Sequence, residues 1–256
     1  MAPPGRPTPQ RPSSAAARPD GPRFEDRRPA DYRHPEANPY VTSHREFGPE
    51  LLTAEQAFAV GRDWASLFGR EAPLHVEIGS GNGFFLAGLA RQNPDVNVLG
   101  IEIRYKRTVL CGRKIREAGV THARIARYHA AFLDDLFEPG AIAVLWVHHP
   151  DPWPKERHEK NRLVSRWFLE DVARLLQPGG FLRLKSDFEP NVARAAHLID
   201  HGPEGEPLPR LPLTVTGRSN DVNAGPAPWA DDIETNYQRK FKRKGEPVYA
   251  IELQRD

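Results

Sequence analysis

The stretch "LHVEIGSGNGFF", residues 74–85, decides the fold class of this chain. Its first five residues form a short, largely apolar run that predicts a buried strand, and residues 83–92 carry the apolar spacing of a helix. Glycines stand between them at positions 79, 81 and 83, where the backbone can turn sharply and approach a ligand closely. A strand that enters a helix through such a turn is typical of a parallel α/β sheet.

Short apolar segments continue to alternate with longer amphipathic ones along the chain. We expect strands at 74–79, 96–103, 123–128, 141–149, 181–187, 213–217 and 248–253. We expect helices at 53–69, 83–92, 106–119, 162–177 and 191–200, the first of them capped by Thr53. Strands joined by helical crossovers predict a doubly wound, mostly parallel α/β sheet of seven strands with helices on both faces.

The composition limits the domain organisation and the setting of the protein. Residues 1–40 are rich in Pro and Arg and poor in large apolar side chains, so we expect a disordered tail, either solvated or in contact with RNA, followed by a single domain at 41–256. The single cysteine excludes a disulfide framework and suits a reducing compartment. No apolar run approaches the roughly 20 residues of a membrane span, and the N-terminus has no secretory signal, so we expect a cytoplasmic protein without membrane contact.

The glycine spacing indicates which ligand the first turn holds. A dinucleotide fingerprint needs G-x-G-x-x-G, but the sixth position counted from Gly79 is Phe84. The G-x-G-x-G pattern of Gly79, Gly81 and Gly83 therefore favours a nucleoside ligand without phosphates, such as S-adenosylmethionine.

Two acids follow the first two expected strands. Glu102 ends the second strand, where a carboxylate can accept both hydroxyls of a ribose; the alternative is an exposed charge at a strand end. Glu77 ends the first strand and either pairs with a cationic amino group of the ligand or orients the glycine turn.

A second unusual stretch is "HHPDPWPKERHEKNR", residues 148–162. Its prolines fix the backbone and remove donors, so it predicts a stiff loop rather than a helix or a central strand. The loop carries an acid, Asp151, close to several bases. Adjacent side chains on a strand end point opposite ways, so His148 and His149 form a poor chelate, and we expect no metal site.

With these motifs the sequence resembles the bacterial tRNA (guanine-N7)-methyltransferases, which are class I, Rossmann-like enzymes that use S-adenosylmethionine. The resemblance rests on "VEIGSGNGFF", "GIEIRYK", "PDPWPKERHEKNRL", "LQPGGFLRLKSD" and "TNYQRKFKRKG", in the family's order over roughly residues 74–253. It implies methylation of a guanine in the tRNA variable loop, with Asp151 as the catalytic residue. It implies substrate contacts from Lys155, Asp187, Thr235, Asn236, Tyr237 and Gln238, and cofactor contacts from Glu77, Gly79, Gly81, Glu102 and His129.

Several positions depart from the family pattern. His129 stands where an Asp usually faces the adenine, His148-His149 replaces an aromatic residue, and Gln238 replaces a Glu. These departures leave open a catalytically weak RNA-binding relative. A separate alternative is a methyltransferase that acts on another RNA or on a small molecule, against which the retained substrate segments argue.

The chemistry of guanine explains why such a site needs acids. N7 carries a lone pair and no proton, so the enzyme has to align N7, the methyl carbon and the sulfur rather than supply a base at N7. A carboxylate accepts both donors of the guanine Watson–Crick edge, a role that suits Asp151 and Asp187. Five of the six residues at 239–244 are basic, and we expect this cluster to bind RNA.

Overall fold

A computed structural model describes residues 38–155, 161–202, 204–230 and 232–256. The predicted tail lies almost wholly outside these ranges, as do residues 156–160 of the Pro-Asp-Pro-Trp-Pro stretch. The first described helix, α1 (Pro39–Arg45), begins inside the segment assigned to the tail. Its N-cap is Asn38, whose side chain accepts a hydrogen bond from the Tyr40 backbone.

One eight-stranded sheet forms the centre of the molecule, in the order β1-β4-β3-β2-β5-β6-β8-β7. Its strands are β1 (Leu51–Leu52), β2 (Leu74–Ile78), β3 (Asn97–Glu102), β4 (Ala123–Arg127), β5 (Ile142–His148), β6 (Leu176–Ser186), β7 (Leu213–Ser219) and β8 (Tyr249–Arg255). Strand β8 runs antiparallel to both β6 and β7, and the other pairings are parallel. The predicted fold class is confirmed; the two-residue β1, paired with β4, adds an eighth strand to the seven expected.

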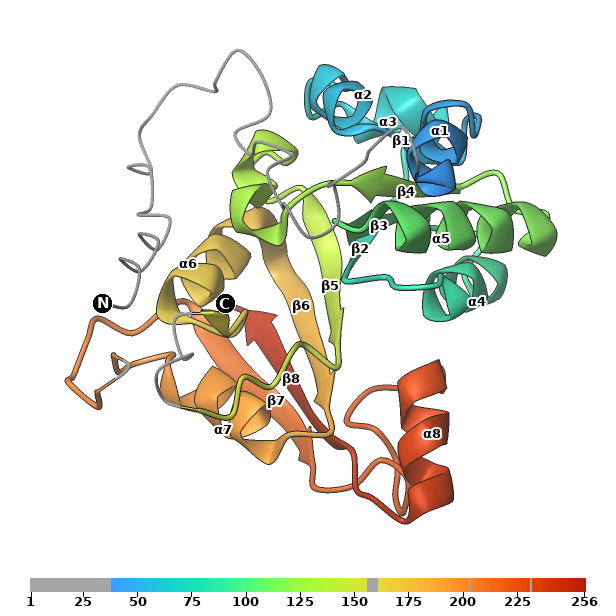
Figure 1. Ribbon diagram of the computed structural model, residues 1–256. Coiled ribbons are helices and arrows are strands. Elements are labelled where there is room, and N and C mark those ends of the chain that lie inside the picture. The colour runs from blue at the N-terminus through green and yellow to red at the C-terminus, as the bar shows by residue number, and fades with distance from the viewer. Residues whose placement is uncertain (1–37, 156–160, 203, 231) are drawn as a thin grey trace, which may run out of the picture.

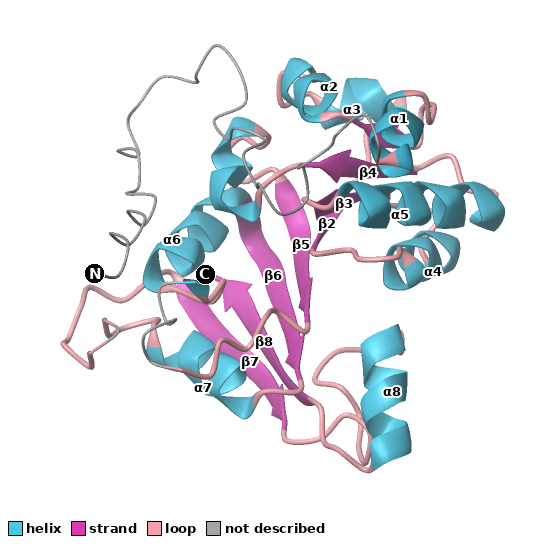
Figure 2. Cartoon of the chain, in the orientation of Figure 1, coloured by secondary structure: helices cyan, strands magenta, loops and turns pink. Residues whose placement is uncertain are grey.

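Helices cover both faces of the sheet (Figures 1 and 2). They are α2 (Ala54–Ala59), α3 (Trp64–Phe68), α4 (Phe84–Gln92), α5 (Tyr105–Ala118), α6 (Arg166–Leu175), α7 (Glu189–His197) and α8 (Asn236–Lys244), with a 3₁₀ helix at Ala130–Asp135. Helices α4 and α5 lie on one face, and α6 and α7 on the other (Figure 1). Figure 1 also places α8 beyond the lower ends of the central strands, on the side of α4.

Two hydrophobic clusters, one on each face, stabilise this arrangement. Val76, Ile78 and Val147 pack with the apolar faces of α2, α3, α6 and α7. Trp146 packs on the opposite face with α4, α5 and Trp229. Because side chains alternate along a strand, Glu77 and His148 fall on the α4 face, at the carboxyl ends of β2 and β5. The sheet thus turns two polar residues towards the end at which α/β proteins bind ligands.

Two of the predicted helices differ most from their expected bounds. The single helix at 53–69 is wrong: the chain forms α2 and α3, separated by Gly61 and Arg62, both with left-handed backbones (φ of +70° and +72°), and Asp63 caps α3. The helix expected at 162–177 begins later, after Ser165, and its last residues belong to β6. None of the helices in the described part of the chain is long and apolar enough to cross a membrane.

Candidate active site

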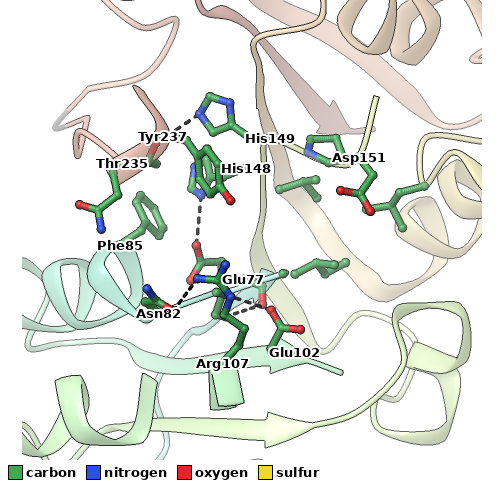
Figure 3. Close-up of a pocket in the computed structure, with 18 of the residues that line it drawn as sticks. Glu77, Asn82, Phe85, Glu102, Arg107, His148, His149, Asp151, Thr235 and Tyr237 are labelled. Atoms are coloured by element: carbon green, nitrogen blue, oxygen red, sulfur yellow. Dashed lines mark hydrogen bonds and ion pairs between the residues drawn. The ribbon is translucent and has the colours of Figure 1, made fainter. Parts of the chain in front are cut away.

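A cavity of about 630 Å³ opens at the carboxyl ends of β2, β3 and β5. The glycine turn after β2, the start of α5, the Pro-Asp-Pro loop after β5 and the first turn of α8 supply its walls. Figure 3 shows the principal side chains that line it. Segments that are far apart in the sequence therefore meet at the edge of the sheet where a ligand was expected.

The glycine turn forms the floor of this cavity. Gly79, Gly81 and Gly83 all have left-handed backbones, with φ values of +74°, +55° and +79°. A Cβ built at Gly79 would meet nothing within 4 Å, so the backbone there faces open space. A Cβ at Gly83 would lie 2.7 Å from the Cα of Cys111, so this glycine lets α4 and α5 approach each other. The turn thus leaves room for a ligand at its start and packs two helices together at its end.

Glu102 links the glycine turn to the start of α5. Its Oε2 accepts a hydrogen bond from the Gly81 N–H (3.2 Å), and its Oε1 accepts from the N–H groups of Ile103 (2.8 Å) and Arg104 (2.9 Å). Beside it, the Arg107 guanidinium donates to Asn82 Oδ1 at 2.6 Å and joins the same two segments (Figure 3). Oε2 accepts only one of these hydrogen bonds and keeps acceptor capacity for a ligand hydroxyl.

Glu77 and His148 form a buried pair in the wall of the cavity (Figure 3). Glu77 is 3% exposed, and its Oε1 lies 3.2 Å from His148 Nδ1. Burial, with the nearby charge of Glu102, raises the pKa of Glu77 to about 8 despite a hydrogen bond from Ser80 that acts against it. Burial also lowers the pKa of His148 well below its usual value, aided by Lys185 and His149. Glu77 Oε2 has no hydrogen-bond partner among the described residues, so one acceptor remains for a ligand.

The Pro-Asp-Pro loop is held from two sides. Asn191, in α7, donates a hydrogen bond to the Pro150 carbonyl at 3.3 Å, and Arg162 donates two to the Trp153 carbonyl at 3.1 and 3.2 Å. Trp153 has a left-handed backbone with φ of +39°. Asp151 stands exposed between these anchors, and no described residue bonds its carboxylate. A fixed backbone therefore presents an acid that remains available to a substrate.

The first turn of α8 closes the cavity on a further side. Thr235 caps this helix by accepting the Gln238 N–H at 3.0 Å, and the half-exposed Tyr237 projects over the cavity (Figure 3). Lys185, fully buried in β6, donates to Gln238 Oε1 (2.9 Å), the Ile233 carbonyl (3.1 Å) and Asp232 Oδ2 (2.7 Å). All three ammonium donors of this lysine thus hold α8 and the segment before it against the sheet.

The comparisons with known proteins agree with this geometry. A family model described as a putative methyltransferase matches residues 71–251. The tRNA (guanine-N(7)-)-methyltransferase of Streptococcus pneumoniae (strain CGSP14) is 34% identical over 217 residues, which cover 82% of this chain and 98% of the relative. The protein of the same description from Streptococcus thermophilus (strain CNRZ 1066) is 33% identical over 210 residues, or 80% of this chain and 91% of the relative. The chain belongs to the tRNA (guanine-N7)-methyltransferase family.

Solved structures support the fold of this tRNA (guanine-N7)-methyltransferase family member. The 16S rRNA methyltransferase KamB matches with a TM-score of 0.52 at 15% identity, over 76% of this chain and 93% of that one. The aminoglycoside resistance methyltransferase NpmB1 matches with a TM-score of 0.51 at 18% identity and the same coverage. At these identities the likeness shows a shared methyltransferase fold.

The structure brings most of the residues predicted for this family into the one cavity. Its lining includes Glu77, Gly79, Gly81, Glu102, Asp151, Thr235, Asn236 and Tyr237. Four predicted residues lie outside the lining. His129 caps the 3₁₀ helix by accepting the Ala131 N–H, Lys155 is exposed at the end of the Pro-Asp-Pro loop, Asp187 bonds His149, and Gln238 is buried against Lys185. Their assigned roles remain predictions.

Other residues of the family member join the site without having been predicted. Phe85, Arg107 and His149 line the cavity, and Asn191 anchors the Pro-Asp-Pro loop from behind. Lys240, from the basic cluster expected to bind RNA, also lines the cavity. Arg107 is a basic residue that directly follows the motif "GIEIRYK", so its proximity in sequence was a usable signal. Asn191 lies 41 positions from its partner, and nothing in its local sequence marks it. Among the described residues, no group of three or more His, Cys, Asp or Glu side chains could hold a metal ion.

Proposed function

We propose that this protein transfers a methyl group from S-adenosylmethionine to N7 of a guanine in the variable loop of tRNA, in the cytoplasm, and that residues 41–256 form the methyltransferase domain. One observation carries the proposal: a single cavity joins the glycine turn and Glu102 to Asp151 and the first turn of α8. A methyl donor and a base can therefore lie side by side. The curated relatives carry the name of the same activity.

The residues on the donor side fit S-adenosylmethionine. The open backbone at Gly79 leaves space along the turn, and Glu102 Oε2 keeps acceptor capacity for a ribose hydroxyl. The unpaired Oε2 of Glu77 suits the amino group of the cofactor. When bound, the cofactor supplies an electrophilic methyl group on a sulfonium.

The residues on the substrate side position and identify the base. Asp151, free of hydrogen bonds with described residues and fixed by its anchored loop, accepts the N1–H and N2 donors of guanine. Adenine offers no such pair of donors, so the carboxylate oxygens would stay unpaired against it once the base covers them. N7 loses no proton in the reaction, so the rate gain comes from alignment rather than from a base.

Basic side chains surround the mouth of the cavity and suit the tRNA backbone. Arg104 and Arg107 lie at the start of α5, and Lys240 lies on α8. With the other basic residues of α8 they provide a surface for phosphates on two sides of the entrance.

The test uses an unmodified tRNA transcript and S-adenosylmethionine labelled in its methyl group. Nucleoside mass spectrometry should detect N7-methylguanosine, and a second transcript with 7-deazaguanine at the target position should accept no methyl group because it lacks N7. The Asp151→Asn protein is the matched negative control. Methylation of the 7-deaza transcript, or labelled nucleosides other than N7-methylguanosine, would refute the assignment.

A further inference from the structure

His149 occupies a constrained place between β5 and the Pro-Asp-Pro loop. Its side chain is 3% exposed, and its backbone is left-handed with φ of +48°. Its N–H donates to the Lys185 carbonyl at 2.8 Å. Left-handed backbones are uncommon for residues other than glycine and gather at functional sites, where the surrounding contacts hold them.

The imidazole joins two elements that are remote in sequence. Nδ1 lies 3.0 Å from Asp187 Oδ1, 38 residues away, and Nε2 lies 3.2 Å from Thr235 Oγ1, 86 residues away. A carboxylate only accepts, so Nδ1 carries the proton in this bond and Nε2 accepts from the Thr235 hydroxyl. Thr235 in turn accepts the Gln238 N–H. A continuous chain of hydrogen bonds therefore runs from the backbone of α8 to the end of β6.

Aromatic packing reinforces the same connection. The His149 ring stacks on Phe241 at 5.5 Å with an interplanar angle of 28°, and it lies 5.6 Å from Tyr237 at 34°. Both partners belong to α8, one turn apart. His149 thus contacts α8 at its N-cap residue, Thr235, and at two of its aromatic side chains, Tyr237 and Phe241.

The hydrogen bond with His149 also affects the protonation of Asp187. Burial raises the pKa of its carboxyl, but the hydrogen bond from His149, with the charge of Lys240, outweighs burial and lowers the pKa below its usual value. The His149 bond engages Oδ1 and leaves Oδ2 outside it, so it also fixes the direction in which the second oxygen points.

We propose that His149 is a positioning residue that fixes the Asp187 carboxylate and the first turn of α8 relative to each other, in the arrangement that the target guanine and its tRNA require. This inference rests on the function proposed above. It gives a role to one of the two histidines that stand where the family pattern has an aromatic residue: the imidazole makes a ring contact with α8 and adds two directional hydrogen bonds.

The arrangement does not make Thr235 a nucleophile. Thr235, His149 and Asp187 stand in the same order as the nucleophile, base and acid of a hydrolytic triad. The Thr235 residue is 5% exposed, however, and its oxygen already caps α8. Guanine N7 carries no proton for His149 to remove. Positioning therefore accounts for the contacts without a proton-transfer step.

Three substitutions separate the two hydrogen bonds. His149→Asn places an amide N–H near the position of Nδ1 and tolerates a left-handed backbone, so it retains the bond to Asp187 and loses the one to Thr235. His149→Gln reaches the position of Nε2 and retains the Thr235 bond alone. His149→Phe keeps an aromatic ring and loses both hydrogen bonds. The Phe and Gln variants share the strain of a left-handed backbone, so comparing them isolates the hydrogen bond to Thr235.

His75→Phe is the matched control, since His75 is a partly buried histidine on the adjacent strand β2, outside the cavity.

Two readouts are needed, one of which is independent of catalysis. Amide hydrogen exchange of residues 236–244, without RNA, reports how firmly α8 is held. We expect about 10-fold faster exchange in the Phe and Asn variants, as for the loss of one hydrogen bond, and near-native exchange in the Gln and His75→Phe proteins. Steady-state methylation should show kcat/KM for tRNA lowered about 10–100-fold in the Phe variant, the range for two lost hydrogen bonds. Relative to the Phe variant, the Asn variant should have a higher kcat, because it keeps the bond that positions Asp187. The Gln variant should have a lower KM for tRNA, because it keeps the bond to Thr235 at the start of α8.

Native exchange and native kinetics in His149→Phe overturn the proposal, and so does a pattern in which the Asn and Gln variants recover nothing relative to Phe. Recovery split between kcat and KM supports it. If the wild-type protein methylates no tRNA, the proposed function fails, and the exchange of α8 still decides whether His149 holds this helix.

Discussion

The Glu77 carboxyl and the His148 ring are partners in one buried hydrogen bond, 3.2 Å from Oε1 to Nδ1, in the wall of the cavity. Their pKa values move in opposite directions: burial raises that of Glu77 to about 8 and lowers that of His148. Near neutral pH both groups are therefore driven towards their uncharged forms, and a cationic group that enters the cavity meets a carboxyl whose ionisation it can promote.

This pair predicts how the stability of the protein depends on pH. The pKa of Glu77 is about 8 in the folded state, against an ordinary value of 4.5, so between these values the folded protein holds a proton that the unfolded chain releases. The free energy of unfolding should therefore fall as pH rises from about 6.5 to 8. Below that window the lowered pKa of His148 acts in the opposite sense.

Glu77→Gln should flatten the dependence, because the amide does not titrate. Thermal unfolding of both proteins at closely spaced pH values between about 6.5 and 8 is the measurement. Parallel curves for the wild type and the Gln variant would contradict the raised pKa.

Glu102→Gln should weaken the binding of S-adenosylmethionine by about 1–3 kcal/mol, the range for the loss of charge-assisted hydrogen bonds. The amide can still accept at one end but loses part of the contacts to Gly81, Ile103 and Arg104, so the turn also loosens. Calorimetric titration with the cofactor gives the dissociation constant, with Glu117→Gln on the exposed side of α5 as the control. An unchanged constant would remove Glu102 from the cofactor site.

Asp151→Asn should lower kcat by about 100-fold or more, equivalent to about 2.7 kcal/mol of barrier, because an amide accepts less well from the guanine edge. Binding of the cofactor should stay nearly intact, since the Asp151 carboxylate forms no hydrogen bond or ion pair with a described residue, those of the glycine turn included. Single-turnover methylation with saturating tRNA is the measurement. Turnover within a few-fold of the wild type would transfer the guanine-reading role to Asp187.

Local sequence was sufficient for the features that depend on local patterns. The alternation of apolar runs predicts the sheet, and the glycine turn and Glu102 were expected at the same end of it, where they do line the cavity, since the ends of parallel strands meet at one edge. The break between α2 and α3 escaped prediction because it depends on a left-handed backbone at Arg62, a residue without a marked preference for that conformation.

Contacts that cross the fold could not be predicted. His149 meets Asp187 and Thr235 over 38 and 86 positions, and Lys185 meets Gln238 over 53. No periodicity or spacing encodes such pairs. The segment before α8 illustrates the same limit: the resemblance predicts that Thr235 to Gln238 contact the substrate, but nothing in the sequence marks the buried Lys185 as the residue that bonds Asp232, Ile233 and Gln238.

The basic residues of α8 should differ in their contributions to RNA binding. Lys242 and Lys244 face acidic partners, Glu234 at 3.9 Å and Glu246 at 3.4 Å, whereas Lys240 and Arg243 form no ion pair within the described part of the chain. A cation that forms no close ion pair loses less when it binds a phosphate. Lys240→Ala with Arg243→Ala should therefore weaken tRNA binding and reduce the slope of log affinity against log salt by about 1–2 units, at roughly 0.7–0.9 per lost phosphate contact.

Lys242→Ala with Lys244→Ala serves as the charge-matched comparison and should change the slope less. Filter binding over a series of salt concentrations measures both, and affinity for S-adenosylmethionine should stay constant. Equal slopes in the two double variants would mean that the net charge of α8 matters and that the presence or absence of an ion pair at each position does not.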